Sequence, residues 1–462
     1  MKLFDTIAAI STPQGKGGVA MIRISGMDAL DVADKIFKRV NKTPLSQADN
    51  AKMVRGIIVD PNTLEEIDDG MAVVFRAPAS FTGENTVEIY CHGGILVTRK
   101  VLAAALLGGA RAAEAGEFTR RAFVSGKMGL SEAEALGSLL EAKSNSQLKL
   151  SRSGMKGTLT KRTTAIYQNL VSVLTGIYAA LDFPDEDLNE YSRNEIAELV
   201  SAALDDISAL AATYGTGRAV AEGIPTVICG KANAGKSSVY NRIIGYDAAI
   251  VTDIEGTTRD VLTQTAILGD TTLLLSDTAG IRQTDDKVES IGIERALTEL
   301  DAAELVLCVF DGAAALDDDD RALIERIINS KKACIALLNK NDLTPNADTV
   351  STVSNYFPNC ISVCASSGKG FDALADTTNK LFIDGSIDMS NDAVVTGARQ
   401  FAALSAAADA LKTSLTELKS EAPLDLCCIG IEAATSAIGE VDGRELGEEI
   451  VSEIFSKFCV GK

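Results

Sequence analysis

The sequence predicts three kinds of domain in one chain of 462 residues: an N-terminal α+β domain, a helical domain, and an α/β domain inserted into the helical one. Three observations predict this architecture: short apolar runs separated by turn residues, helix-forming segments with apolar residues three and four apart, and a central part in which strands alternate with helices. A chain of this length can form about two to four domains that each bury a core. We expect the N-terminal domain at 1–125, the helical domain at 126–218 and 385–462, and the inserted domain at 219–384.

The N-terminal region combines short strands with two helices. Val54–Val59, Met71–Phe75 and Val87–Tyr90 are apolar runs bounded by turn residues, which is typical of strands. Met27–Arg39 and Leu96–Leu107 have the apolar spacing of helices. This mixture predicts an α+β domain.

The helical domain is predicted from strong helix formers between Ser131 and Thr213, and from two later stretches, Gly397–Lys419 and Gly443–Phe458. Five strands are expected between these parts: Thr226–Cys229, Thr272–Ser276, Leu305–Phe310, Cys334–Leu338 and Cys360–Val363. Their alternation with helices predicts a parallel sheet covered by helices on both faces. The acidic run Asp317–Asp320 is expected in a loop or at a helix N-terminus.

The composition indicates an ordinary soluble protein, with 46% apolar and 23% charged residues. No apolar run is long enough for a bilayer span, and the first residues do not resemble a signal peptide, so we expect a cytoplasmic protein that does not enter a membrane. The nine cysteines show no metal-ligand spacing, and His92 is the single histidine. Reduced thiols are therefore expected, and histidine-rich metal chemistry is excluded.

The net charge of −20 repels nucleic acid at long range. Any contact with RNA therefore needs a local basic patch or the surface of a partner. The stretch between Ala142 and Leu181 contains no acid and six bases: Lys143, Lys149, Arg152, Lys156, Lys161 and Arg162. A solvated helix face and an RNA contact are both compatible with this stretch.

A phosphate-binding loop is predicted at Gly230–Ser238, which follows an apolar strand, opens a helix and fits the pattern G-x-x-x-x-G-K-S. Backbone N–H groups of such a loop close around the phosphates at a helix N-terminus that favours anions. Lys236 is expected to neutralise the β and γ phosphates, and Ser237 to hold Mg²⁺. The nucleotide contacts expected in the loop are Asn233, Ala234, Gly235, Lys236, Ser237 and Ser238.

Two further motifs follow predicted strands. Asp277-Thr278-Ala279-Gly280 offers an acid for the Mg²⁺ shell and a glycine N–H that can sense the γ-phosphate. In Asn339-Lys340-Asn341-Asp342, the Asp342 carboxylate can accept the N1 and N2 protons of guanine, which adenine does not offer. Three ordered motifs, each at the C-terminal end of a predicted strand, predict a GTPase domain.

A switch segment lies between the first two motifs. Thr257 and Thr258 are expected to contact the nucleotide, and the Thr258 hydroxyl to complete the Mg²⁺ shell when the loop closes on the γ-phosphate. Many small GTPases position the attacking water with a glutamine where this chain has Ile281. Another polar group must take that role, and the residues themselves leave the choice open within Asp285–Glu289.

Several segments outside the three motifs carry a family resemblance. They include Arg23-Ile24-Ser25-Gly26, Ser80-Phe81-Thr82-Gly83-Glu84, the run from Gly116 to Phe123, Thr252-Asp253-Ile254, and the run from Val288 to Glu294. The final Cys459-Val460-Gly461-Lys462 fits a terminal Cys-x-Gly-Lys. Together these segments resemble the MnmE (TrmE) family of tRNA-modification GTPases along the whole chain.

The resemblance implies the ion and the catalytic acid. It implies that Asn233 binds a potassium ion together with Thr252, Ile254 and Thr257, so that the cation supplies charge that an arginine finger supplies elsewhere. It also implies that Glu289 positions the attacking water. With Lys236 and Thr258, Glu289 then completes the expected catalytic set.

The resemblance further implies a second ligand and partners. The N-terminal domain is similar to tetrahydrofolate-binding domains, and the family's folate contacts match Arg23, Glu88, Lys127 and Lys462, for 5-formyl- or methylene-tetrahydrofolate. The family acts as a homodimer with the flavoprotein MnmG and modifies C5 of the wobble uridine of certain tRNAs. Without the resemblance, Arg23, Glu88 and Lys127 would be read as surface charges.

Three departures from the family pattern stand in the nucleotide region: Lys231-Ala232 in place of Arg-Pro, Glu255 at a position that is commonly small and neutral, and Cys364-Ala365-Ser366 in place of Ser-Ala-Lys. Two other functions remain open at this point. One is a ribosome-assembly GTPase or RNA-binding switch without modification chemistry. The other is a scaffold that binds folate structurally while GTP turnover opens and closes a partner's active site.

Overall fold

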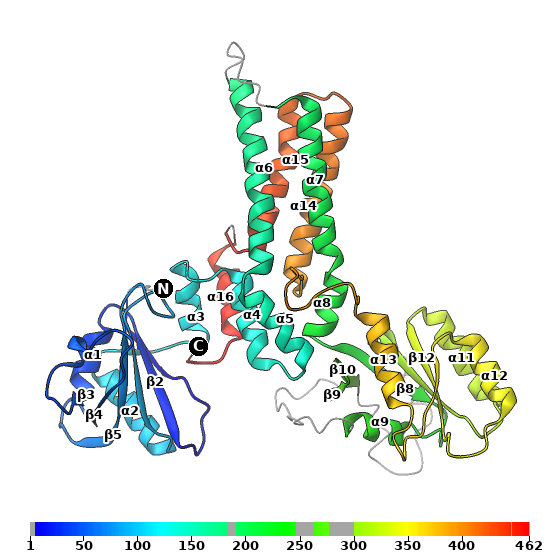
Figure 1. Ribbon diagram of the computed structural model, residues 1–462, viewed down its shortest axis with the longest axis horizontal. Coiled ribbons are helices and arrows are strands. Elements are labelled where there is room, and N and C mark those ends of the chain that lie inside the picture. The colour runs from blue at the N-terminus through cyan, green and yellow to red at the C-terminus, as the bar shows by residue number, and fades with distance from the viewer. Residues whose placement is uncertain (1–4, 183–190, 246–262, 277–299, 445, 462) are drawn as a thin grey trace. The chain divides into compact units, whose positions relative to one another are not determined.

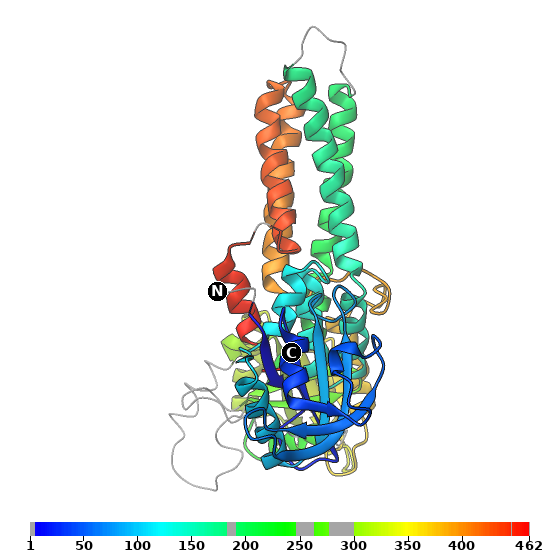
Figure 2. The same cartoon turned by 90° about the vertical axis from the view of Figure 1, so that its left-hand side faces the viewer.

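The computed structural model describes residues 5–182, 191–245, 263–276, 300–444 and 446–461. The chain forms two compact units. The first comprises Met1–Gly137 and Gly439–Lys462, and the second comprises Ser138–Ile438. Figures 1 and 2 show both units, with a mixed α and β structure in the first and a helical part plus an α/β part in the second.

The first unit is built on a seven-stranded sheet of order β3-β4-β5-β6-β2-β1-β7. Its strands are β1 (Ile7–Ile10), β2 (Val19–Ser25), β3 (Phe37–Arg39), β4 (Val54–Val59), β5 (Glu66–Phe75), β6 (Thr86–His92) and β7 (Arg111–Ala112). Neighbouring strands are antiparallel except β7, which runs parallel to β1. The predicted strand Val54–Val59 is confirmed as β4, but the sequence pattern did not predict β1 and β2.

Helices cover the two faces of this sheet unequally. α1 (Ala29–Ile36) and α2 (Ile95–Leu107) pack on the face formed by alternate residues such as Ile22 and Ile89. On the other face, Ile7 and Ala9 pack against Phe118 of α3 (Glu117–Val124). The helix predicted at Met27–Arg39 ends at Ile36, because Phe37–Arg39 pairs with β4 as an edge strand. A short 3₁₀ helix, η1 (Leu45–Gln47), follows that strand.

A buried group of charged side chains fixes α3 to the start of the chain. The guanidinium of Arg121, only 4% exposed, pairs with Asp5, Glu84 and Glu117, while Arg111 pairs with Asp5 and Glu117. Burial raises the pKa of Glu117, but hydrogen bonds from Arg111 and Arg121 outweigh it and hold that pKa below its usual value. Each buried charge is therefore compensated, as burial requires.

The C-terminal segment returns to the N-terminal part within the first unit. After α16 (Glu448–Ser456), Val460 bridges Ala115, and the Ser11 hydroxyl donates to the Gly461 carbonyl at 2.8 Å. Gly461 has φ +97°, and a Cβ there would lie 2.4 Å from the Ile10 carbonyl oxygen. Only glycine fits this position, because a side chain would be strained and would overlap the β1 backbone.

The helical part of the second unit contains helices α5 (Asn145–Met155), α6 (Thr158–Asp182), α7 (Arg193–Ala212), α8 (Tyr214–Ala221), α14 (Ala398–Lys419) and most of α15 (Leu424–Val441), whereas most of α4 (Leu130–Glu141) belongs to the first unit. The long helices α6, α7, α14 and α15 run side by side in both views (Figures 1 and 2). By length and composition alone α6 could cross a membrane, and a third of its most apolar window is buried in the protein. α15 was not predicted, whereas the helix expected at Gly397–Lys419 is confirmed as α14.

The α/β part contains a six-stranded sheet of order β13-β12-β11-β8-β10-β9. Its strands are β8 (Ile224–Gly230), β9 (Thr263–Leu268), β10 (Thr271–Ser276), β11 (Leu305–Asp311), β12 (Ala333–Asn339) and β13 (Cys360–Ser362). Five strands are parallel, as predicted, but the sheet is not wholly parallel, because β9 pairs antiparallel with β10. A two-residue turn links those strands, which permits only the antiparallel direction.

Helices cover both faces of this sheet, as predicted. α9 (Lys236–Ile244) and α13 (Phe371–Phe382) pack on one face, and α11 (Asp318–Ser330) and α12 (Ala347–Tyr356) pack on the other. Asp317 caps α11, so the acidic run Asp317–Asp320 lies at a helix N-terminus, which was one of the two positions expected for it. The fold class of three domain types is confirmed, while the boundaries at 1–125, 126–218, 219–384 and 385–462 stay a prediction.

The docked C-terminal segment gives a testable prediction. Gly461→Ala should destabilise its docked state by about 1–3 kcal/mol, because alanine strains at positive φ. Hydrogen–deuterium exchange of the C-terminal peptide should become faster, whereas Val460→Ala, which trims a side chain that is 58% exposed, should leave it unchanged. Equal exchange in Gly461→Ala and the wild type would contradict the docking.

Candidate functional site

Those predicted nucleotide residues that the structure describes gather at one edge of the α/β sheet. Because β8, β12 and β13 run parallel, their carboxyl ends meet at that edge. The phosphate-binding loop follows β8, Asn339 ends β12, and Cys364-Ala365-Ser366 follows β13. Three of the sequence motifs are therefore neighbours in space.

The loop has the backbone of an anion site. α9 begins at Lys236 with Gly235 in the N-cap position, and no side chain caps its first N–H groups. Asn233 and Gly235 both have positive φ, 62° and 97°. Ser237 and Ser238 lie exposed in the first turn of α9.

Two lysines of the loop are held in place. Lys236 Nζ donates to the Lys231 carbonyl at 2.8 Å, across the mouth of the loop, and burial lowers the pKa of Lys236. Lys231 forms an ion pair with Asp317, the N-cap of α11. The departure Lys231-Ala232 therefore keeps a charged anchor at the start of the loop.

Asn339 links three segments through its side chain and is only 3% exposed. Its Nδ2 donates to the Ala234 carbonyl at 3.0 Å, and its Oδ1 accepts from the Ala365 N–H at 3.1 Å. A Cβ on Gly235 would lie 2.1 Å from that same Nδ2, so the loop can approach only because residue 235 is glycine. Asn339 thereby sets the spacing between the loop at Gly230–Ser238 and the segment after β13.

The segment that follows β12 exposes a carboxylate. Lys340, at φ 64°, pairs with Asp311 at 2.6 Å, which turns the chain at the end of β12. Asp342 is exposed, and its Oδ1 accepts a weak hydrogen bond from Cys364 Sγ at 3.4 Å. Asp342 thus lies beside residues 364–366, the segment expected to contact the base.

Several predicted site residues lie outside the described residues. They are Thr252, Ile254, Thr257, Thr258, Asp277, Thr278, Ala279, Gly280, Glu289 and Lys462, together with Glu255. Ser276 ends β10, which is parallel to β8, so the chain leaves β10 at the same sheet edge just before Asp277.

Two of the residues predicted in the N-terminal domain form one site. Arg23 of β2 and Glu88 of β6 face each other across the sheet. The Arg23 Nε and Nη2 atoms both donate to Glu88 Oε1, at 3.0 and 2.9 Å. Both side chains are largely shielded, with 15% and 12% exposure, so neither is an ordinary surface charge.

Aromatic rings complete the surroundings of this pair. The Arg23 guanidinium lies 5.4 Å from the Phe81 ring centre and 5.7 Å from that of Phe118, within the range of cation–π attraction. Lys127 is exposed, and its Nζ donates to the Pro78 carbonyl at 3.0 Å, on the loop that leads to Phe81. The structure thus joins Arg23 and Glu88 directly and places Lys127 on an adjoining loop.

Tyr90 belongs to the same site and was not predicted. Its hydroxyl donates to Glu88 Oε2 at 2.7 Å, and burial together with this hydrogen bond raises the pKa of Tyr90 to about 12. Residues two apart on a strand share a face, so the sequence periodicity could have identified Tyr90 once Glu88 was selected.

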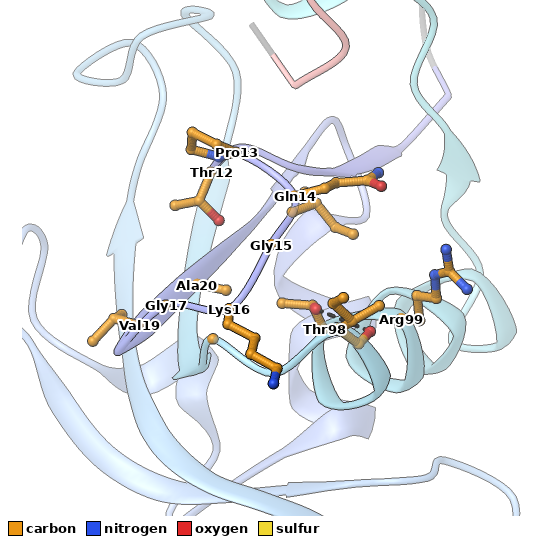
Figure 3. A pocket seen from close by; sticks show the side chains of 13 residues that line it. Thr12, Pro13, Gln14, Gly15, Lys16, Gly17, Val19, Ala20, Thr98 and Arg99 are labelled. Atoms are coloured by element: carbon orange, nitrogen blue, oxygen red, sulfur yellow. Dashed lines mark hydrogen bonds between the residues drawn. The ribbon is translucent and has the colours of Figure 1, made fainter.

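A separate pocket of about 380 Å³ lies in the first unit (Figure 3). It is lined by the loop from Thr12 to Gly17, by β2 residues and by the first turns of α2. Lys16 and Arg99 are its charged lining residues, and their side chains point away from each other in Figure 3. The two cations do not converge on a single ligand position, and none of the predicted site residues lines the pocket.

Comparison with known proteins identifies the family to which the chain belongs. The model for the GTP-binding protein TrmE N-terminus matches residues 6–127, and the model for the MnmE helical domain matches residues 130–459. Proteins named tRNA modification GTPase MnmE are similar over 99% of both chains: 37% identical in Natranaerobius thermophilus, 39% in Lactiplantibacillus plantarum and 40% in Symbiobacterium thermophilum. The chain is a GTP-hydrolysing enzyme and belongs to the MnmE (TrmE) family of tRNA modification GTPases.

Proposed function

We propose that this enzyme is a potassium-dependent GTP hydrolase that acts with the flavoprotein MnmG to modify C5 of the wobble uridine of certain tRNAs, using a one-carbon unit of tetrahydrofolate. The observation that carries the proposal is the full-length similarity to MnmE proteins, at 37–40% identity over 99% of the chain. The paired Arg23 and Glu88 in the N-terminal domain support it, because a plain GTP switch needs no second ligand site.

The nucleotide roles follow from the edge of the α/β sheet. The uncapped start of α9 and Lys236 hold the phosphates, and Asp342 accepts the N–H edge of guanine. The hydroxyl of Ser237, exposed at the start of α9, is a suitable ligand for Mg²⁺. Thr258 and Asp277–Gly280, which lie outside the described residues, are proposed to complete the Mg²⁺ shell. Glu289 is proposed to orient the attacking water.

Potassium is proposed to bind through Asn233 with Thr252, Ile254 and Thr257. Asn233 fits this role, because it is an exposed residue with a carboxamide oxygen in the loop just before α9, at a positive φ of 62°. When bound, a monovalent cation supplies positive charge where the transition state becomes more negative.

The folate site is proposed at Arg23, Glu88, Lys127 and Lys462. A shielded carboxylate fits the N–H edge of a pterin, and the basic residues fit the carboxylates of the folate tail. Gly461, the residue before Lys462, docks beside Ser11, which follows β1, and β1 pairs with the strand that carries Arg23. When bound, the folate supplies the one-carbon unit.

The remaining parts of the proposal concern assembly. We propose a homodimer that associates with MnmG and tRNA in the cytoplasm. The domain boundaries given above belong to the same proposal.

Guanine selectivity is tested by Asp342→Asn. One acceptor oxygen becomes a donor facing the guanine N–H groups, which should cost about 2–4 kcal/mol of GTP binding. Xanthine carries oxygen where guanine carries its amino group, so the variant should bind XTP better than GTP. Calorimetry with both nucleotides measures this, with Asp348→Asn on the surface of α12 as the control. A variant that binds GTP normally and ignores XTP would refute the role of Asp342.

Potassium dependence is tested by GTP turnover in KCl and NaCl at equal ionic strength. We expect faster turnover in KCl, by roughly tenfold or more. Asn233→Gly removes the carboxamide but tolerates the positive φ, so it should abolish the difference between the salts. Asn241→Ala, on the exposed side of α9, should preserve it. Equal wild-type rates in both salts would remove the proposed cation site.

The folate site is tested by Glu88→Ala in the full-length protein. Loss of the charged acceptor should weaken binding of 5-formyl-tetrahydrofolate by roughly tenfold to a hundredfold, while GTP turnover stays normal. Glu66→Ala, an exposed carboxylate on the same sheet, should bind as the wild type does. Undiminished binding by Glu88→Ala would show that folate, if bound, uses another site.

A further inference from the structure

Glu88 uses its two oxygens for different partners. Oε1 accepts both hydrogen bonds from Arg23, and Oε2 accepts the hydrogen bond from Tyr90. Three of the roughly four acceptor positions of the carboxylate are therefore taken by groups of its own domain. A ligand edge that presents two N–H donors finds only one position open, so it can use both donors only if one of these two partners moves away.

We propose that Arg23 is the partner that moves, and that Tyr90 is a positioning residue that holds Glu88 for the pterin ring. This inference rests on the folate site of the proposed function and deepens it. The guanidinium of Arg23 presents two N–H groups to Glu88, as the N–H edge of a pterin would. Arg23 thus occupies the ligand's place, and binding is an exchange at Oε1.

The two partners differ in how firmly they are held. Tyr90 lies on the same strand as Glu88, two residues away, so its hydroxyl and the carboxylate share one rigid element. Arg23 lies on the neighbouring strand at the end of a long side chain. Phe81 and Phe118 offer it a second attraction, so it can leave Glu88 and remain over the rings.

The hydrogen bond from Tyr90 matters more after the exchange. After the exchange, Glu88 faces a neutral pterin ring instead of the positive charge of Arg23. A shielded carboxylate that has lost its cation is stabilised only by the hydrogen bonds that it still accepts, so the bond from Tyr90 counts for more. The Tyr90 hydroxyl is protonated at neutral pH and can donate this bond, and burial raises its pKa further, to about 12. The displaced Arg23 is free to pair with a carboxylate of the folate tail.

The surface beside Tyr90 can receive the rest of the ligand. Met71 lies directly opposite Tyr90 on β5 and is 44% exposed. Val19, on the same face of the sheet, is 63% exposed. This half of the face therefore offers apolar surface next to the carboxylate, as the ring system of a folate requires.

The role of Tyr90 is tested by Tyr90→Phe in the full-length protein, with calorimetry of two probes. One probe is 5-formyl-tetrahydrofolate, and the other is its analogue without the 2-amino group, which lacks one N–H donor to Glu88. Tyr90→Phe should bind the parent compound about tenfold more weakly. It should also discriminate less between the two probes, by about threefold or more, because a carboxylate that is no longer fixed aligns less well with the second donor.

If Tyr90 had only a structural role, Tyr90→Phe would lower the affinities for both probes equally, and the ratio of the two affinities would stay as in the wild type. That result would overturn the proposal. A Tyr90→Phe protein that binds 5-formyl-tetrahydrofolate as tightly as the wild type would overturn it as well. Tyr178→Phe removes another tyrosine–glutamate hydrogen bond, in the second unit, and should leave both affinities unchanged. Unaltered GTP turnover and circular dichroism show that Tyr90→Phe is folded. A wild type that binds neither probe would instead refute the proposed folate site itself.

The exchange is tested with a tetrahydropterin that has no glutamate tail. Arg23→Met removes the competing guanidinium and keeps a side chain that can pack on the rings. It should bind this probe at least as tightly as the wild type, yet bind 5-formyl-tetrahydrofolate about tenfold more weakly, since the tail has lost its cation. A loss of affinity for both ligands to the same extent would show that Arg23 supports Glu88 in the complex rather than competing with the ligand.

Discussion

The side chain of Asn339 is the interaction on which the nucleotide edge depends. One buried carboxamide joins the phosphate loop, through Ala234, to the segment after β13, through Ala365. Since Asn339 is only 3% exposed, water cannot replace either bond, and each partner left unsatisfied would cost about 1–3 kcal/mol. The parallel sheet brings these segments to one edge, and the two hydrogen bonds of Asn339 set the spacing between them.

The Arg23–Glu88 site of the N-terminal domain is held together by different interactions from those at the α/β sheet edge. Its charged residues project from the face of an antiparallel sheet rather than from strand ends. Behind them, Arg121 ties α3 to Asp5 and Glu84, and so fixes Phe118 below Arg23. The buried ion group and the cation–π contacts together make a shielded pair from residues that would otherwise be solvated charges.

Sequence reasoning predicted the α/β part well, because loop motifs and strand alternation both depend on local patterns. It missed β9, whose direction is set by its pairing with β10, and the edge strand Phe37–Arg39, where pairing with β4 overrides a helical pattern. Arg23 and Glu88 were expected only from the family resemblance, since β2 was not predicted and their register depends on long-range pairing. The return of Gly461 to Ser11 spans 450 positions, so no local pattern could indicate it.

GTP hydrolysis and folate recognition are proposed to serve one product, a modified wobble uridine. Mass spectrometry of tRNA nucleosides from cells that lack this protein tests that claim most directly, with the wild-type chain and a Lys236→Ala chain each returned to those cells. The modified wobble uridine should disappear in the deletion, return with the wild type, and stay absent with Lys236→Ala. An unchanged nucleoside profile in the deletion would contradict the proposed function, and full restoration by Lys236→Ala would separate GTP turnover from the modification.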